Sequence, residues 1–326
     1  MTEFKRYLSP QLIGALNKLA DPLAPLNWWQ DVLDSNDLHI AVRGGYLNAY
    51  SQGQSIFKIG AENGTGLDTE GNPVVSINYK YLLKPSRPPG KRYIRFTGKS
   101  FLINPHEVIC TDYEPDRTLN RLIDAASPYT SEEKKGVHVI ARKNPTVVDL
   151  EIAFTQTGEA EEDAKALRID LAALHPDGAG KAKLVFYEAK RADDKRLRAG
   201  PTGEPEVVKQ MESYDKFLYE HAADLAKAYQ DVCATLVKLC SRGSRALPEL
   251  IKEVGAEPPA RTLSVDPVAR LLVFGFDEDQ KKGDIFRRHI EALQDRLKRP
   301  VVAKGNPESF DLVEDYKRFP PFAPVA

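Results

Sequence analysis

The segments LRIDLAAL (Leu167–Leu174) and KLVFYEAKR (Lys183–Arg191) decide the fold of this chain. Apolar and polar residues alternate in both, as in strands that bury one face of a sheet. The stretch HPDGAGK (His175–Lys181) between them has the Pro, Asp and Gly residues of a turn. The preceding segment VVDLEIAFT (Val147–Thr155) alternates in the same way. We therefore predict a meander of antiparallel strands.

Each of these predicted strands carries an acidic residue near its middle. They are Glu151, Asp170 and Glu188, and Lys190 follows Glu188 by two positions. Because residues two apart on a strand share a face, Glu188 and Lys190 are expected in one site, with Asp170 on the neighbouring strand. Buried carboxylates are costly unless they are compensated, and converging oxygen ligands suit a hard divalent cation. The strands therefore predict a metal-binding site.

The order of these residues resembles the core signature of the PD-(D/E)XK nuclease superfamily. That signature places an Asp on one strand and Glu-x-Lys on the next. Here Asp170 is followed 18 residues later by Glu188, Ala189 and Lys190. Ile169 stands at the position of the family's proline.

The next predicted helix adds a second element of the resemblance. Gln210 and Tyr214 form a Q-x-x-x-Y pattern similar to that of RecB-type nucleases in the same superfamily. Four residues apart on a helix, both side chains lie on one face. Tyr214 also falls on the apolar stripe of that helix, so a core tyrosine is an alternative. The resemblance spans roughly residues 147–214 and does not extend to the first hundred residues.

The resemblance implies a phosphodiester hydrolase that requires a divalent metal, usually Mg²⁺, which Mn²⁺ can replace. Asp170, Glu188 and the backbone carbonyl of Ala189 would hold the metal. Lys190 would position or activate the attacking water. A bound metal offsets charge on the phosphate and lowers the pKa of a coordinated water. Gln210 and Tyr214 are expected to belong to the same active site.

A further acidic ligand usually comes from upstream of this signature. Glu151 is expected in that role, both as a metal ligand and as a member of the active site, because it lies mid-strand near Asp170. Asp149, Glu132 and Glu133 are alternatives for the same role. A surface ion pair between Glu151 and Arg168 is the structural alternative.

The segment KRADDKRLRAG (Lys190–Gly200), directly after the signature, is rich in basic residues. Contacts with the phosphate backbone of nucleic acid are expected from Lys190, Arg191, Lys195, Arg196 and Arg198. A solvated loop is the structural alternative, and the two roles do not exclude each other.

The rest of the chain alternates between helix and strand. Apolar residues three and four apart predict one helix over Val207–Leu239. A buried strand, a helix and a final strand are predicted at Ala269–Asp277, Asp284–Lys298 and Pro300–Gly305. The predicted fold class is α/β, and the resemblance implies a restriction-endonuclease-like core, a mixed sheet flanked by helices.

The N-terminal third is predicted to be a β-rich domain. Alternating segments at Leu38–Gly60, Val74–Leu83 and Lys91–Ile103 indicate antiparallel strands. We place the domain boundary near Pro115, which gives a β-rich domain of residues 1–115 and a nuclease domain of residues 116–326. Because the first domain is basic and rich in tyrosine, it is a candidate for substrate or partner recognition, and solvated strand faces are the alternative.

The composition narrows the class of protein. The 326 residues include 46 Lys and Arg against 47 Asp and Glu, for a net charge of −1. This balance excludes a strongly basic, histone-like protein but not a local basic surface. Three cysteines are too few for a disulfide framework or a four-cysteine zinc site. We find no secretory signal and no apolar stretch of about 20 residues, so we expect a cytoplasmic protein that does not bind membranes.

These features predict a Mg²⁺-dependent nuclease, with DNA favoured as substrate and endonuclease favoured over exonuclease action. Restriction or anti-phage defence is the favoured role, because a nuclease joined to an unrelated β-rich module resembles restriction-type proteins. DNA repair or recombination is an alternative role. A catalytically silent nucleic-acid-binding or assembly protein and an unrelated metal-dependent hydrolase are alternative functions. A protein partner or an oligomer is compatible with the sequence.

Overall fold

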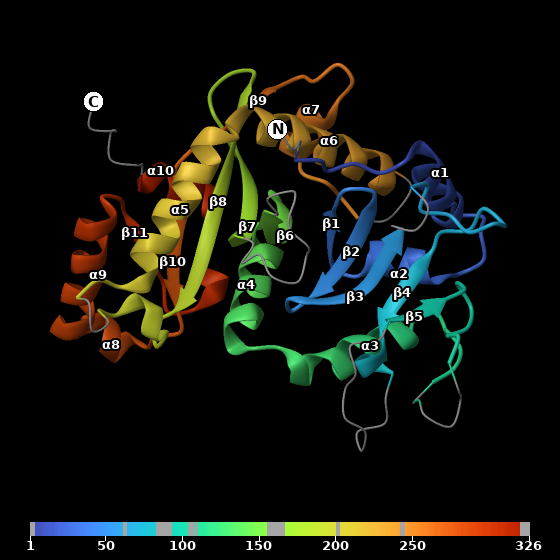
Figure 1. The fold of residues 1–326 in the computed structure, drawn as a ribbon, viewed down its shortest axis with the longest axis horizontal. Coiled ribbons are helices and arrows are strands. Elements are labelled where there is room, and N and C mark those ends of the chain that lie inside the picture. Colours follow the sequence, from blue (N-terminus) through green and yellow to red (C-terminus); the bar gives the residue numbers. More distant parts are fainter. Residues whose placement is uncertain are drawn as a thin grey trace. The chain divides into compact units, whose positions relative to one another are not determined.

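The computed structural model describes residues 4–60, 64–82, 93–103, 108, 110–154, 167–199, 203–241 and 245–319. The chain forms two compact units, each built around its own sheet (Figure 1). One unit comprises Lys5–Ser131 and Ala228–Ala260, and the other comprises Met1–Phe4, Glu132–Lys227 and Arg261–Ala326. Predicted strand ends at Leu83, Lys91 and Thr155 lie outside the described residues, as does Gly200 at the end of the predicted basic loop.

The first unit contains the predicted β-rich region. Its antiparallel sheet has the order β1-β2-β3-β4-β5. The strands are β1 (His39–Val42), β2 (Tyr46–Ser51), β3 (Gln54–Gly60), β4 (Val75–Asn78) and β5 (Tyr93–Phe96). The helices of this unit are α1 (Pro10–Leu19), α2 (Trp28–Asp34), α3 (Thr118–Ala126), most of α6 (Ala222–Cys240) and α7 (Glu249–Gly255). Residues 116–131, assigned from the sequence to the second domain, lie in this unit because α3 packs against β3.

One face of the first sheet is apolar and forms the core of this unit. Trp28, at the start of α2, packs against Phe57 of β3 and Phe96 of β5, with ring centroids 5.7 and 6.0 Å away. The start of α2 is fixed by a capping box, in which Asn27 and Gln30 each satisfy a backbone N–H of the other. The cap therefore fixes where Trp28 enters the core.

The second unit contains a mixed sheet. Its strands are β6 (Val147–Phe154), β7 (Leu167–Pro176), β8 (Lys181–Arg191), β9 (Thr262–Val265), β10 (Arg270–Phe274) and β11 (Val301–Ala303). Their order is β11-β10-β8-β7-β6, and β9 also pairs with β8. Strands β6, β7 and β8 are antiparallel, whereas β8, β10 and β11 run parallel. The predicted meander is confirmed.

Helices flank this mixed sheet, as predicted for the α/β class. They are α4 (Glu132–Lys143), α5 (Glu206–Glu220), α8 (Glu278–Lys282), α9 (Asp284–Leu297) and α10 (Leu312–Arg318). Helix α4 contacts β7 and β8, and α5 contacts β7. Gly136 allows α4 to approach β10 closely, because a Cβ atom there would lie 2.2 Å from the ring of Phe274.

The prediction of one continuous helix over Val207–Leu239 is wrong. The backbone of His221, at φ −115° and ψ 15°, leaves the helical conformation, and α5 ends there before α6 begins. Apolar residues remain three and four positions apart in the sequence on both sides of His221. The spacing therefore gives no sign that the helix is interrupted there. Among the described residues, no helix has the length and apolar character required to cross a membrane.

A buried polar cluster holds α10 against β7 and β8. His175 Nε2 lies 2.8 Å from the Tyr187 hydroxyl, and the His175 ring packs on Tyr316 of α10 with centroids 4.7 Å apart. The Tyr316 hydroxyl donates to Asp266, which also forms an ion pair with Arg270 at 2.9 Å. Burial lowers the pKa of His175 to about 3, so the imidazole is neutral in the folded protein at neutral pH.

His175 is expected to make the protein less stable in mild acid. Between pH 6 and pH 4 the unfolded chain protonates this imidazole and the folded chain does not, so the free energy of unfolding falls as the pH falls. One such proton contributes a slope of about 1.4 kcal/mol per pH unit. Urea unfolding at several pH values should therefore show a shallower dependence for His175→Gln than for the wild type. Equal slopes would contradict the assignment.

Candidate active site

The strand register brings the three predicted carboxylates into one row. Leu150 pairs with Leu171 and Ile152 with Ile169, so Glu151 falls opposite Asp170. The pairing of β7 with β8 ends at Leu171 and Tyr187, and Asp170 and Glu188 are the next residues on the two strands. Side chains in one row of a sheet point to the same face. The register therefore places Glu151, Asp170 and Glu188 at neighbouring positions on three adjacent strands.

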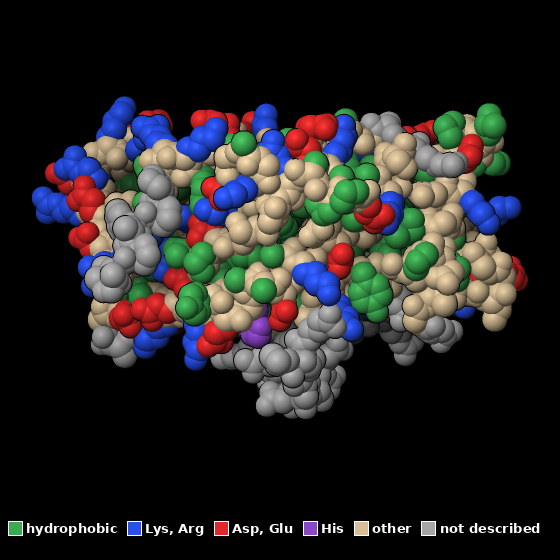
Figure 2. Space-filling model, turned by 90° about the horizontal axis from the view of Figure 1, so that it is seen from above, with side chains coloured by type: hydrophobic (Ala, Val, Ile, Leu, Met, Phe, Trp, Pro, Cys, Tyr) green, Lys and Arg blue, Asp and Glu red, His purple; other side chains and the backbone are tan. Residues whose placement is uncertain are grey.

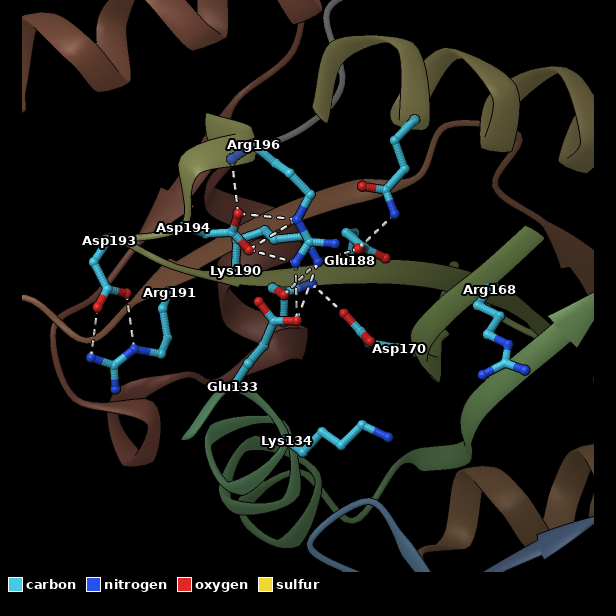
Figure 3. Close-up of polar contacts among 12 residues, drawn as sticks. Glu133, Lys134, Arg168, Asp170, Glu188, Lys190, Arg191, Asp193, Asp194 and Arg196 are labelled. Atoms are coloured by element: carbon cyan, nitrogen blue, oxygen red, sulfur yellow. Dashed lines mark hydrogen bonds and ion pairs between the residues drawn. The ribbon is translucent and has the colours of Figure 1, made fainter. Parts of the chain in front are cut away.

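Lys190 is buried among the acidic groups of this row (Figure 3). Its side chain is 2% exposed, and its ammonium forms an ion pair with the equally buried Glu188 carboxylate. The ammonium also donates to the backbone carbonyl of Ala189 at 3.2 Å. Asp170 accepts a hydrogen bond from the Ala189 backbone N–H at 2.9 Å. Asp170, Glu188, Ala189 and Lys190 thus form one connected cluster.

The Q-x-x-x-Y pair of α5 contacts the same cluster. Gln210 Nε2 donates to Glu188 Oε1 at 2.9 Å, and the Tyr214 hydroxyl lies 3.1 Å from Glu188 Oε2. Gln210 also donates to the Tyr214 hydroxyl at 2.6 Å, and that hydroxyl contacts the backbone carbonyl of Arg168. Tyr214 is a buried core residue whose hydroxyl also contacts the Glu188 carboxylate.

Two upstream glutamates lie beside the cluster. Glu133, in the first turn of α4, is 3.6 Å from Lys190 Nζ and 3.5 Å from the Arg196 guanidinium. Glu151 forms an ion pair with Lys134 of α4 at 3.2 Å. Arg168, the partner considered from the sequence, lies apart from the acidic cluster in Figure 3. The structure therefore brings Glu133 into direct contact with Lys190, a contact that it does not show for Glu151.

Glu151 has an unusual backbone conformation. Its φ of 51° lies in the left-handed region of backbone conformations, which residues other than glycine rarely adopt. Such conformations cost about 1–3 kcal/mol and cluster at functional sites. The strain at Glu151, on the strand beside Asp170, supports its place in the candidate site. Asp149, an alternative from the sequence, is fully buried and accepts a hydrogen bond from the Leu150 N–H.

The carboxyl groups of the cluster are poorly compensated by its one buried lysine. Burial raises the pKa of Asp170 well above its usual range, and the charge of Glu188 raises it further. Burial also raises the pKa values of Glu188 and Glu133, against the opposing effect of Lys190. Although burial disfavours charged lysine, the surrounding carboxylates raise the pKa of Lys190 above its usual value. Lys190 stays protonated and does not neutralise the whole cluster.

The predicted metal ligands fit Mg²⁺ in their chemistry. The carboxylates of Asp170 and Glu188 and the carbonyl of Ala189 are oxygen donors, which hard cations prefer. A bound divalent cation would favour the ionised forms of these carboxyl groups and so oppose the effect of burial on their pKa values. The Lys190 ammonium, however, contacts Glu188 and the Ala189 carbonyl. In the part of the chain that the structure describes, no group of three or more His, Cys, Asp or Glu side chains is arranged to hold a metal ion.

The predicted basic loop is largely paired with its own acidic residues. Arg191 forms an ion pair with Asp193 at 2.9 Å, and Arg196 pairs with Asp194 at 2.5 Å. Arg198 donates to the backbone carbonyls of Asp193 and Ala192. Lys195 is exposed. Of the basic residues predicted to contact nucleic acid, the structure exposes Lys195 and Arg198 most, while Lys190 is buried.

An ion pair that the sequence analysis missed fixes α5 to the sheet. Arg299, before β11, forms a two-pronged ion pair with Asp215, which directly follows Tyr214 on α5. Asp215 also accepts the Ala269 backbone N–H at 2.9 Å, and Arg299 donates to the Ala269 carbonyl at 2.9 Å. The contact joins residues 84 positions apart, for which the sequence offers no signal.

Removing this ion pair is expected to destabilise the fold. Arg299→Ala leaves the Asp215 carboxylate partly buried without its guanidinium, and breaking such a pair costs about 3–5 kcal/mol. Urea unfolding of the metal-free protein measures this change. The matched control is Arg287→Ala, which breaks an exposed pair with Asp284 and should change the free energy of unfolding little. A similar small change for Arg299→Ala would contradict the expected role.

Removing the Tyr214 hydroxyl is expected to impair the site more than the fold. Tyr214→Phe keeps the buried ring but loses the contact with the Glu188 carboxylate. Partners that orient ligand side chains typically affect metal affinity or activity by about 10–100-fold. Titration of the protein with Mg²⁺ should show this loss as a weaker affinity. Tyr229→Phe, at a fully buried tyrosine of α6, is the control, and equal losses in both variants would contradict a role for the hydroxyl.

Comparison with known proteins identified no relative of this chain. No family model, no curated protein and no solved structure matches this chain. The functional interpretation therefore depends on the geometry of the site itself.

Proposed function

We propose that this protein is a metal-dependent nuclease that hydrolyses phosphodiester bonds in nucleic acid, with DNA as the favoured substrate. One observation carries the proposal. Asp170 and Glu188 directly adjoin the end of the β7–β8 pairing, and Lys190, Gln210 and Tyr214 all contact Glu188. These are the residues that the PD-(D/E)XK resemblance assigns to one active site.

The topology of the second unit supports a restriction-endonuclease-like core. Three antiparallel strands, β6 to β8, are followed by α5 and then by β10, which pairs parallel to β8. The Asp and the Glu-x-Lys lie on the second and third of these strands, which is the arrangement that the signature implies. An endonuclease is favoured because the chain joins this core to a separate β-rich unit, as restriction-type proteins do. The same analogy favours restriction or defence as its role.

The residues of the site have distinct roles in the proposed reaction. A bound Mg²⁺ would supply charge compensation and lower the pKa of an attacking water. Asp170, Glu188 and the Ala189 carbonyl would hold it, which requires the Lys190 ammonium to leave Glu188. Gln210 and Tyr214 would keep the Glu188 carboxylate in place.

Lys190 is the group expected to act on the phosphate. Its raised pKa keeps the ammonium charged at neutral pH. A charged donor held in a site that excludes water stabilises negative charge developing on the reacting phosphate. The glutamates around Lys190 would also limit how far its ammonium can move, because Glu133 lies 3.6 Å from it on α4.

The test is cleavage by the purified full-length protein. Circular and linear DNA, each single- and double-stranded, and RNA would be incubated with Mg²⁺, Mn²⁺ or EDTA. Metal-dependent cleavage of a closed circle is expected, which also distinguishes endonuclease from exonuclease action. Lys281→Ala, at an exposed lysine of α8, is the control for purification and should cut as the wild type does. Absence of cleavage from every substrate would contradict the proposal.

A further inference from the structure

One face of the N-terminal sheet is polar across its width. The register pairs Asn48 with Lys58, Lys58 with Ser76, and Ser76 with Arg95, so one row of polar side chains crosses four strands. The adjacent row on the opposite face consists of buried apolar residues, Leu47, Ile59, Val75 and Phe96. The sheet therefore uses one face for its core and presents a different chemistry on the other.

Tyrosines flank this polar row. Tyr46 and Tyr50 alternate with Asn48 along β2, and the Lys58 ammonium lies 4.6 Å from the Tyr46 ring centroid. Tyr93 lies on β5 two residues before Arg95 and is 59% exposed. Exposing a large aromatic side chain on a strand leaves a flat apolar ring available for stacking. We call this surface, defined by Tyr46, Tyr50, Lys58, Tyr93 and Arg95, the tyrosine–basic face.

The charged side chains that the strands themselves contribute to this face are both basic. The strands β1 to β5 contain no Asp or Glu, whereas Lys58 and Arg95 both lie in the polar row. The Arg95 guanidinium is 3.4 Å from Asp68, with the arginine side chain 46% exposed. Exposed ion pairs of this kind are worth about 0–1 kcal/mol, so a phosphate can replace Asp68 as the partner of Arg95 at little cost.

We infer that the tyrosine–basic face binds single-stranded nucleic acid. Aromatic rings stack with unpaired bases, and basic side chains next to them contact the phosphates, which is how sequence-tolerant single-strand binding works. In a duplex the base faces are stacked on one another, so the tyrosines would have nothing to stack against. The inference shares its ligand class with the proposed function, but binding by this face does not depend on cleavage.

On the molecular face drawn in Figure 2, Lys and Arg side chains are interspersed with Asp and Glu. A duplex binds mainly through many phosphate contacts, which require an extended basic surface. The combination of a few cations with one exposed tyrosine, Tyr93, and two half-buried ones, Tyr46 and Tyr50, is better matched to a single strand.

The test is fluorescence anisotropy in EDTA, with labelled oligo-dT, oligo-U and a duplex, each of about 20 nucleotides. The full-length protein should bind the single strands more tightly than the duplex, and the two single-stranded probes show whether the sugar matters. Tyr93→Ala should weaken binding by about 5- to 100-fold, as expected for one lost stacking contact. Arg95→Gln should reduce the dependence of log affinity on log salt concentration by about 0.7.

Matched controls separate this face from the rest of the surface. Tyr219→Ala removes a tyrosine of α5 that is 77% exposed, and Lys252→Gln removes an exposed lysine of α7. Both should bind as the wild type does, and thermal unfolding should be near wild type in all four variants. Tyr93→Ala and Arg95→Gln that bind like the wild type, or a preference for the duplex, would overturn the inference. Cleavage without binding at this face would leave the proposed function standing, and binding without cleavage would leave the inference standing.

Discussion

Lys190→Met is expected to lower the rate of metal-dependent cleavage by about a hundredfold to ten-thousandfold. Methionine fills a similar volume in the buried position but has no positive charge to stabilise the reacting phosphate. Lys190 is 1% exposed and surrounded by Glu133, Asp170 and Glu188, so its ammonium is the positive charge that the chain itself supplies at this point. Single-turnover cleavage of the best substrate found for the wild type measures the loss.

The control for Lys190→Met must show that the fold persists. Circular dichroism and thermal unfolding should give a folded variant, because the carboxylates left behind can take up protons, as their raised pKa values already favour. Lys134→Met, which removes the ion pair with Glu151 on the neighbouring strand, is the matched substitution and should reduce cleavage less. A Lys190→Met protein that cleaves at the wild-type rate would place the activity elsewhere.

Asp170→Asn is expected to abolish Mg²⁺ binding and at the same time to stabilise the metal-free protein. The pKa of Asp170 is raised in the folded state, so the folded chain holds its proton to higher pH than the unfolded chain does. Protonated Asp170 therefore favours the folded state at low pH. This contribution to the free energy of unfolding is lost as the pH rises above the pKa that Asp170 has in the unfolded chain. Asparagine removes that cost and can still accept the Ala189 N–H.

Thermal unfolding with and without Mg²⁺ measures both effects. Without metal, Asp170→Asn should melt above the wild type at neutral pH, and the difference should shrink in acid. A ligand present at 100 times its dissociation constant stabilises a protein by about 2.7 kcal/mol, so saturating Mg²⁺ should raise the melting temperature of the wild type but not of the variant. Asp193→Asn, in the exposed pair with Arg191, is the control and should respond to Mg²⁺ as the wild type does. Equal responses in Asp170→Asn and the wild type would contradict the assignment.

Much of the fold follows from local patterns in the sequence. The predicted strands of the meander match β6, β7 and β8, and the alternation within them puts Asp170 and Glu188 in one row. Short elements were harder to predict, since β9, at Thr262–Val265, has too few residues for periodicity to show. Strand β9 becomes visible only through its pairing with β8.

The parts of the site that the sequence did not predict depend on tertiary packing. Glu133 is one of the alternatives that the sequence offers for the upstream acidic residue, but nothing in the sequence ranks it above Glu151, because an acidic residue in the first turn of a helix is ordinary there. Its contact with Lys190 arises from the way α4 packs against β7 and β8. The pairing of Arg196 with Asp194 and Glu133 likewise turns a residue expected to bind nucleic acid into a neighbour of the acidic cluster. Local patterns do not encode such contacts between distant segments.

The most direct test of the proposed nuclease site is the cleavage of covalently closed circular DNA, single- and double-stranded, by wild-type protein and Asp170→Asn side by side in Mg²⁺. Asparagine differs from aspartate in having an amide nitrogen in place of one carboxylate oxygen. Its remaining side-chain oxygen can still accept the hydrogen bond from the Ala189 backbone N–H. We expect the wild type to convert at least one circle to linear or nicked product and Asp170→Asn to leave both circles intact. Equal conversion by both proteins, or none by the wild type, would contradict the account.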